Sequence, residues 1–100
     1  MYLTTLNGHV KKENRRTLEE SYAKKAKHPP EGLLQSFLIH DKEDKSDWQI
    51  ISVWRNEEAY IAAKAGGLAD TCEDLFCDAG ATPERRHYDV AERFIRIASE

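Results

Sequence analysis

Asn7 and His9 stand two residues apart in the segment YLTTLNGHV, residues 2–10, and both side chains could serve a bound ligand. Asparagine is disfavoured inside a strand, so Asn7 is either an edge residue that faces water or a hydrogen-bond donor directed at a ligand. His9 is expected to share a strand face with Asn7, because side chains alternate along a strand. Its imidazole could act as a base near neutral pH, and an exposed surface position is the alternative.

Trp54 closes the segment WQIISVW, residues 48–54, directly before a segment of helical character. A large aromatic side chain at the end of a strand most often fills the core beneath a helix. The alternative is that Trp54 lines a ligand pocket. A buried indole N–H needs an acceptor, which a bound ligand or a water molecule could supply. Both interpretations stay open at this point.

Four further side chains are candidates for contact with a substrate: Tyr22, Tyr60, Phe76 and Arg86. Helical periodicity places both tyrosines on the inner faces of their helices, where they form either core or pocket wall. Phe76 is expected to fill or border the same space. Arg85 and Arg86 lead into the last predicted strand, where either arginine could hold an anionic substrate or be ordinary surface charge.

The hydrophobic pattern predicts the elements that would position these residues. Strands are expected at 2–10, 33–40, 48–54 and 86–97, and helices at 12–27, from an Asn56 cap to about Ala65, and at 68–80. The order β-α-β-β-α-β, with the second helix split in two, predicts an α+β, ferredoxin-like fold. We therefore expect one domain, residues 1–100, with a four-stranded antiparallel sheet and helices on one of its faces.

Neither face of the predicted sheet is polar throughout. The expected division is Trp48, Ile50, Ser52 and Trp54 against Gln49, Ile51 and Val53 on the third strand, and Leu33, Gln35, Phe37 and Ile39 against Leu34, Ser36, Leu38 and His40 on the second. An antiparallel sheet with one solvated face should alternate cleanly between apolar and polar residues. Helices cover one face only, so a second copy of the chain is the simplest cover for the other, and we expect a homodimer.

The composition excludes several classes of partner. With 33% charged residues, a net charge of −3, a pI near 5.8 and basic pairs interleaved with acids, the chain offers no track for nucleic acid. No apolar run approaches the roughly 18 residues of a membrane span. The first residues lack the pattern of a signal peptide, so we expect a cytoplasmic protein in which Cys72 and Cys77 stay reduced.

The segment PEGLLQSFLIHDKEDKSDWQIISVWRNEEAYIAAKA, residues 30–65, is similar to the core signature of the antibiotic biosynthesis monooxygenase-like domains, which are dimeric α/β-barrel proteins. The matching features are Gly32, the acidic turn at 41–47, the pair Val53-Trp54, Asn56, Glu57, Glu58 and Tyr60. The resemblance implies a cavity between the sheet and its own helices. It also implies that Trp54 lines this cavity and that Asn7 matches a ligand-directed asparagine of several family enzymes.

The resemblance further implies cofactor-independent oxygenation of an aromatic or quinone-like small molecule, in which the substrate itself donates electrons to oxygen. The haem-degrading branch places an iron-ligating histidine on the second helical segment, and residues 60–77 contain none. We therefore expect no haem, and we expect no flavin or metal, because no glycine-rich phosphate loop and no ligands at metal-site spacing are present. A non-catalytic ligand-binding or regulatory dimer of the same fold is the alternative.

Overall fold

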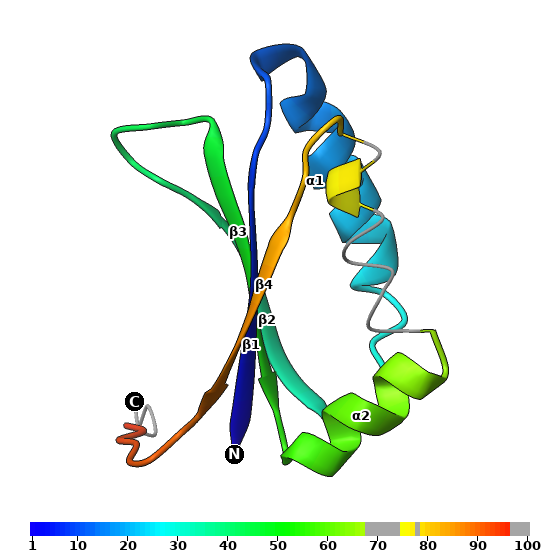
Figure 1. Cartoon of the computed structure of the whole chain (residues 1–100), viewed down its shortest axis with the longest axis vertical. Coiled ribbons are helices and arrows are strands. Elements are labelled where there is room, and N and C mark those ends of the chain that lie inside the picture. The colour runs from blue at the N-terminus through cyan, green and yellow to red at the C-terminus, as the bar shows by residue number, and fades with distance from the viewer. Residues whose placement is uncertain (68–74, 78, 97–100) are drawn as a thin grey trace.

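The computed structural model describes residues 1–67, 75–77 and 79–96, and its elements follow the predicted order (Figure 1). These are β1 (Tyr2–His9), the 3-10 helix η1 (Lys12–Asn14), α1 (Arg15–Lys25), β2 (Leu33–His40), β3 (Asp47–Trp54), α2 (Glu57–Ala65) and β4 (Glu84–Asp89). Residues 75–77 are also helical, and the rest of the helical piece predicted at 68–80 lies mostly outside the described residues. The predicted α+β, ferredoxin-like fold is confirmed.

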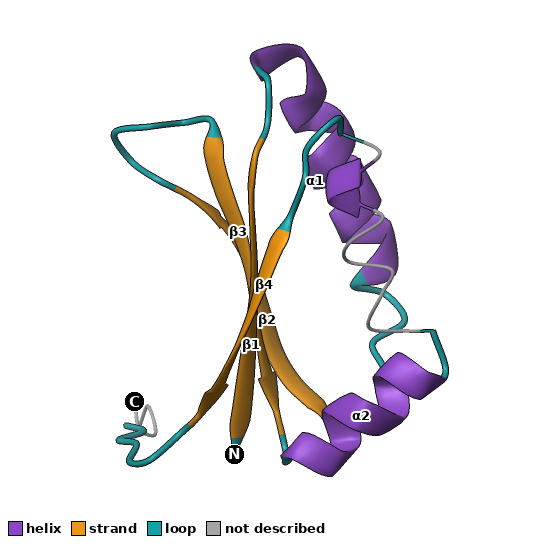
Figure 2. Ribbon diagram, viewed as in Figure 1, coloured by secondary structure: helices purple, strands orange, loops and turns teal. Residues whose placement is uncertain are grey.

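All four strands belong to one antiparallel sheet, in the order β2-β3-β1-β4. The sheet is twisted, and α1 and α2 both lie on the same side of it (Figure 2). We call the side turned toward the helices the covered face and the other side the open face. Within the described residues, no helix is long and apolar enough to cross a membrane.

Local sequence explains the helix boundaries. The prolines after His28 cannot continue α1, because proline lacks the backbone donor that a helix interior needs. At α2, Asn56 has an extended backbone, and its side-chain oxygen accepts a hydrogen bond from the Ala59 N–H at 2.8 Å. Glu57 and Glu58 then occupy the first turn, where the helix dipole favours negative charge. The predicted cap is therefore confirmed.

The last strand departs from the prediction of 86–97. It begins earlier, at Glu84, and ends at Asp89. Its partner β1 begins at Tyr2, which pairs with Asp89, and one further hydrogen bond joins the Val90 N–H to the Met1 carbonyl at 3.2 Å. The described residues beyond Val90, 91–96, have no β1 residue opposite them, so their apolar pattern does not produce a strand.

The two faces of the sheet follow from alternation, with one exception. β3 divides as predicted, with Trp48, Ile50, Ser52 and Trp54 on the covered face, each of them buried. On β2 a bulge lies between Leu33 and Gln35. The bulge turns Leu33 to the covered face, opposite Trp54, which corrects its predicted place beside Gln35 and Phe37.

The main core lies between the covered face and the helical segments. It consists of Leu6, Val10, Leu18, Trp48, Ile50, Leu75, Phe76 and Ala79. Gly8 permits a close approach of β1 to this core, because a Cβ at this position would stand 2.8 Å from the Phe76 ring. A second, smaller cluster at the α2 end contains Tyr2, Trp54, Tyr60 and Ala63.

Candidate functional site

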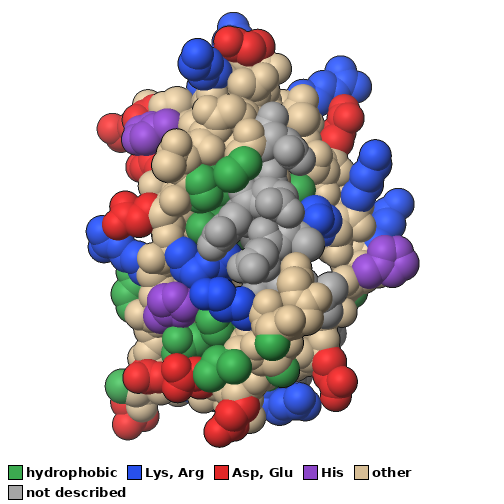
Figure 3. Space-filling model, turned by 45° about the vertical axis from the view of Figure 1, so that its right-hand side comes forward, with side chains coloured by type: hydrophobic (Ala, Val, Ile, Leu, Met, Phe, Trp, Pro, Cys, Tyr) green, Lys and Arg blue, Asp and Glu red, His purple; other side chains and the backbone are tan. Residues whose placement is uncertain are grey.

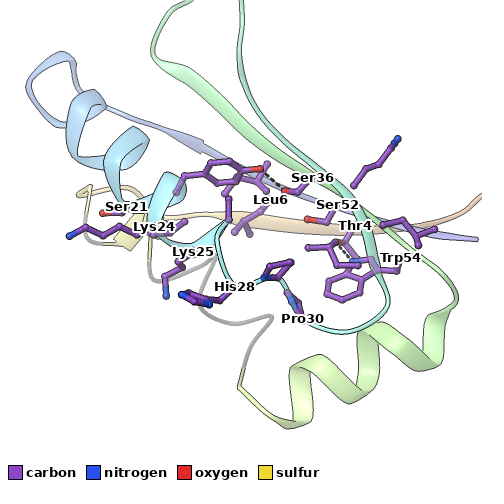
Figure 4. Close-up of a pocket in the computed structure, with 18 of the residues that line it drawn as sticks. Thr4, Leu6, Ser21, Lys24, Lys25, His28, Pro30, Ser36, Ser52 and Trp54 are labelled. Carbon is purple, nitrogen blue, oxygen red and sulfur yellow. Dashed lines mark hydrogen bonds between the residues drawn. The ribbon is translucent and has the colours of Figure 1, made fainter. Parts of the chain in front are cut away.

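A cavity of about 700 Å³ opens between the covered face and the C-terminal part of α1 (Figure 4). Its floor comes from the covered face of the sheet, including Thr4, Leu6, Ile50, Ser52 and Trp54. Its other described walls come from residues 21–22, 24–26, 28–30 and 33–36, and from Leu75 and Arg85. A cavity of this size and mostly apolar lining is typical of sites for small organic ligands.

Trp54 is both a wall of this cavity and a member of the smaller core cluster. Its side chain is 3% exposed and packs edge-on against Tyr60, with ring centroids 5.5 Å apart. The indole N–H donates a hydrogen bond to Thr4 Oγ1 at 3.2 Å. The two interpretations of Trp54 are thus compatible, because the indole has a partner within the chain and still borders the cavity.

Tyr22 lines the cavity, which agrees with its interpretation as pocket wall. Its phenol donates a hydrogen bond to Ser36 Oγ at 2.7 Å, and this bond ties α1 to β2. Tyr60 and Phe76 do not line the cavity. Tyr60 supports Trp54 from behind, and Phe76 is fully buried in the main core beneath Gly8.

Asn7 and His9 share a strand face, but it is the open face, away from Trp54. The Asn7 side-chain amide donates to Asp47 Oδ1 at 2.8 Å and to the Trp48 carbonyl at 3.2 Å, so it braces β1 against β3. His9 is exposed. The structure therefore does not bring these two predicted catalytic residues to the cavity of their own chain. The reason is the strand period of two, because Leu6 and Gly8 occupy the covered face.

The same alternation separates the two arginines of β4. Arg86 pairs with Thr5 on the open face, and its guanidinium contacts Glu84 Oε1 at 3.3 Å. This hydrogen bond raises the pKa of Arg86 above its usual value. Arg85 pairs with Leu6, lines the cavity, and stacks over the Tyr60 ring with its guanidinium carbon 5.8 Å from the centroid. Of the two, Arg85 is the cavity residue, which corrects the choice of Arg86.

The described part of the cavity lining is basic. Lys24, Lys25, His28 and Arg85 contribute to it, and no aspartate or glutamate does among the described residues. On the face of the molecule shown in Figure 3, a group of Lys, Arg and His side chains lies left of centre, and other Lys and Arg side chains stand at the edges together with Asp and Glu. The cavity is therefore suited to a ligand with negative charge.

A pair of aromatic residues lies beside the cavity at the α2 end. The Tyr2 hydroxyl and His87 Nδ1 form a hydrogen bond of 3.0 Å. Burial raises the pKa of the Tyr2 phenol, and the nearby Glu57 carboxylate raises it further, because both disfavour a phenolate. Tyr2 is consequently a neutral structural side chain at physiological pH.

The hydroxyl groups of the cavity floor, on Thr4, Ser36 and Ser52, were not among the predicted site residues. A signal was present in the sequence, because Ser52 interrupts an aromatic and aliphatic face formed by Trp48, Ile50 and Trp54. Across the described ranges, no group of three or more His, Cys, Asp or Glu residues is placed to hold a metal ion. Cys77 is exposed and free, and Cys72 falls outside those ranges.

Solved structures with the same fold cover nearly the whole chain. A protein from Deinococcus radiodurans described as an antibiotic biosynthesis monooxygenase superposes with a TM-score of 0.74 over 98% of this chain and 100% of its own, at 16% identity. SnoaB from Streptomyces nogalater, a cofactor-independent oxygenase, superposes with a TM-score of 0.72 over 95% of this chain and 98% of its own, at 18% identity. MhuD from Mycobacterium tuberculosis, a haem degrader, superposes with a TM-score of 0.72 over 94% of this chain and 99% of its own, at 16% identity. At these identities the likeness concerns the fold.

The sequence comparison is more decisive about the family. No curated protein matches the chain. The family model for antibiotic biosynthesis monooxygenases matches residues 1–70, which include β1, α1, β2, β3, α2 and most of the cavity wall. The chain therefore belongs to the antibiotic biosynthesis monooxygenase family.

Proposed function

We propose that this protein is a cofactor-independent monooxygenase that oxidises an aromatic, quinol-like small molecule in the cavity between the sheet and α1. The observation that carries the proposal is the cavity itself, about 700 Å³ in volume, with the Trp54 ring in its wall and basic side chains in its lining. Family membership and the fold shared with SnoaB support it.

In this proposal the substrate supplies the electrons and molecular oxygen accepts them. A phenol reacts with oxygen far more readily as its phenolate, so a site that favours the anion promotes the reaction. The apolar walls around Leu6, Ile50 and Trp54 exclude water and strengthen electrostatic interactions within the cavity. The nearby cations and hydroxyl groups then stabilise the negative charge on the substrate oxygen.

The stoichiometry requires no external reductant. A ring C–H of a dihydroxynaphthalene becomes a quinone C=O, one atom of O2 enters this carbonyl, and the other leaves as water. We expect 1,5-dihydroxynaphthalene to give saturable oxygen uptake above its spontaneous rate. With ¹⁸O2, mass spectrometry should find one labelled atom in the quinone product.

Two tryptophans provide a matched test of where this reaction occurs. Trp54 and Trp48 are 3% and 5% exposed, and the indole N–H of each is bonded within the chain, but Trp54 lines the cavity and Trp48 does not. Trp54→Phe should lower the rate of uptake, while Trp48→Phe should leave it unchanged. Saturable binding of the naphthalene without any enzymatic oxygen uptake would contradict the proposal and favour a ligand-binding protein.

We further propose that the working form is a homodimer joined through the open faces. Phe37, Ile39 and Tyr88 lie on this face and are 48%, 41% and 45% exposed. Exposed apolar side chains on one face of a sheet are typical of a surface that another protein covers. A second copy would cover them with the same residues, as a twofold-symmetric interface requires.

A further inference from the structure

A line of polar side chains crosses the covered face at one level of all four strands. Strand pairing places Ser36 beside Ser52, Ser52 beside Thr4, and Thr4 beside His87. The neighbouring levels on β1, β2 and β3 are apolar or aromatic: Leu38, Ile50 and Leu6 on one side, and Leu33, Trp54 and Tyr2 on the other. Hydroxyl groups in such surroundings cost free energy unless they find hydrogen-bond partners.

The hydrogen bonds of this row leave donors unused. Ser36 Oγ accepts from the Tyr22 phenol, and Thr4 Oγ1 accepts from the Trp54 indole, so both hydroxyls have accepted a hydrogen bond and still carry their own proton. Ser52 is 7% exposed, and its hydroxyl has no hydrogen bond to any described residue. All three line the cavity (Figure 4). The row therefore presents O–H donors to whatever occupies the cavity.

Three of the four basic residues in the described lining lie at a different end of the cavity from Trp54, whereas Arg85 stacks over Tyr60, which packs against Trp54. Lys24, Lys25 and His28 come from the end of α1 and the segment after it, whereas Trp54 and Thr4 lie at the opposite end (Figure 4). Neither lysine forms an ion pair with a described residue. A ligand that satisfies both ends needs a negatively charged group separated from an acceptor oxygen by a flat apolar body.

We propose that the cavity takes an aromatic acid that also carries a ring oxygen. Its rings lie between Leu6, Ile50 and Trp54, and its phenolate or carbonyl oxygen accepts a hydrogen bond from Ser52, aided by Thr4 or Ser36. Its carboxylate faces Lys24 and Lys25. The inference rests on the proposed function in using the same cavity, and it names the class of compound that the cavity selects.

Matched probes test the hydroxyl contact. By isothermal titration calorimetry, Ser52→Ala should weaken binding of 6-hydroxy-2-naphthoate by about five- to tenfold, the usual effect of one lost hydrogen bond. Its effect on 2-naphthoate, which lacks the ring oxygen, should stay below about twofold. Ser52→Thr keeps the hydroxyl and should retain the preference for the hydroxylated probe. An equal loss for both probes in Ser52→Ala would overturn the assignment of Ser52.

A second pair of probes tests the charged end. Replacing both Lys24 and Lys25 by Gln should weaken 6-hydroxy-2-naphthoate about three- to fivefold at low salt and less at high salt, because exposed charges are screened. Binding of 2-naphthol, which has no carboxylate, should not change. Lys27→Gln is the control, since Lys27 does not line the cavity. The same loss in the control, or in the binding of 2-naphthol, would overturn the charge assignment.

These measurements concern binding alone, so they separate this inference from the proposed reaction. The expected binding pattern, together with no oxygen uptake on 1,5-dihydroxynaphthalene, would support the ligand class and contradict the oxygenase. If the protein takes up oxygen but its affinity for the naphthoates does not change when Ser52 or the two lysines are replaced, the oxygenase is supported and the ligand class is overturned. If neither naphthoate binds at millimolar concentration, the ligand class is overturned as well.

Discussion

The covered and open faces of the sheet are made from alternate residues of the same strands, yet they have different surroundings. On the covered face, Leu6, Ile50 and Trp54 are 2%, 1% and 3% exposed. On the open face, Phe37 and Ile39 are nearly half exposed in the single chain. The polar row of Ser36, Ser52 and Thr4 occurs on the buried side. Apolar content therefore does not distinguish the covered face from the open face, whereas the row of hydroxyl groups beside the cavity does.

The largest expected difference between the faces concerns stability. Trp54→Ala should lower the free energy of unfolding by about 3–5 kcal/mol, because it empties a large aromatic site. Trp54→Phe keeps most of the volume and should cost only about 1 kcal/mol. Urea denaturation measures both.

The open-face counterpart is Phe37→Ala, measured on protein dilute enough to be monomeric. It should cost less than about 1 kcal/mol, because half of this side chain is already exposed. Equal costs for Trp54→Ala and Phe37→Ala would show that the two faces do not differ as described.

The next effect concerns assembly. Phe37→Glu places a charge among the exposed apolar residues of the open face and should weaken the dimer roughly thirtyfold, or about 2 kcal/mol. Analytical ultracentrifugation should then show a shift toward the 11.5 kDa chain at micromolar concentration. Ile61→Glu is the control, because Ile61 is 55% exposed on α2 and outside the open face. A wild-type protein that sediments as a monomer would remove the basis for the dimer.

The smallest effect is the pH dependence of stability. Burial, with the nearby Glu57, raises the pKa of Tyr2 in the folded chain, so the folded state holds this proton more tightly than the unfolded state does. The contribution is complete below the unfolded value, about 10, and is lost as the pH rises through the folded value. The free energy of unfolding should therefore fall above pH 10. Urea denaturation at a series of pH values should show a less steep fall for Tyr2→Phe. Equal slopes for Tyr2→Phe and its parent chain would contradict the role assigned to burial.

Local signals were sufficient for most of the fold. The limits of β2, the Asn56 cap of α2 and the alternation of β3 were predicted correctly, because each depends on residues close together in the chain. The errors have a common origin in long-range pairing. β4 ends where β1 offers no further partner, and Leu33 changes face because a bulge intervenes before Gln35.

The sequence by itself determined which residues share a strand face, since alternation is a local property of an extended backbone. It placed Asn7 with His9, as the structure has them. Only the tertiary structure decided which of the two faces the helices cover, because that choice depends on how α1 and α2 pack across the sheet. This packing put Trp54, Ser52 and Arg85 at the cavity and left Asn7, His9 and Arg86 on the open face.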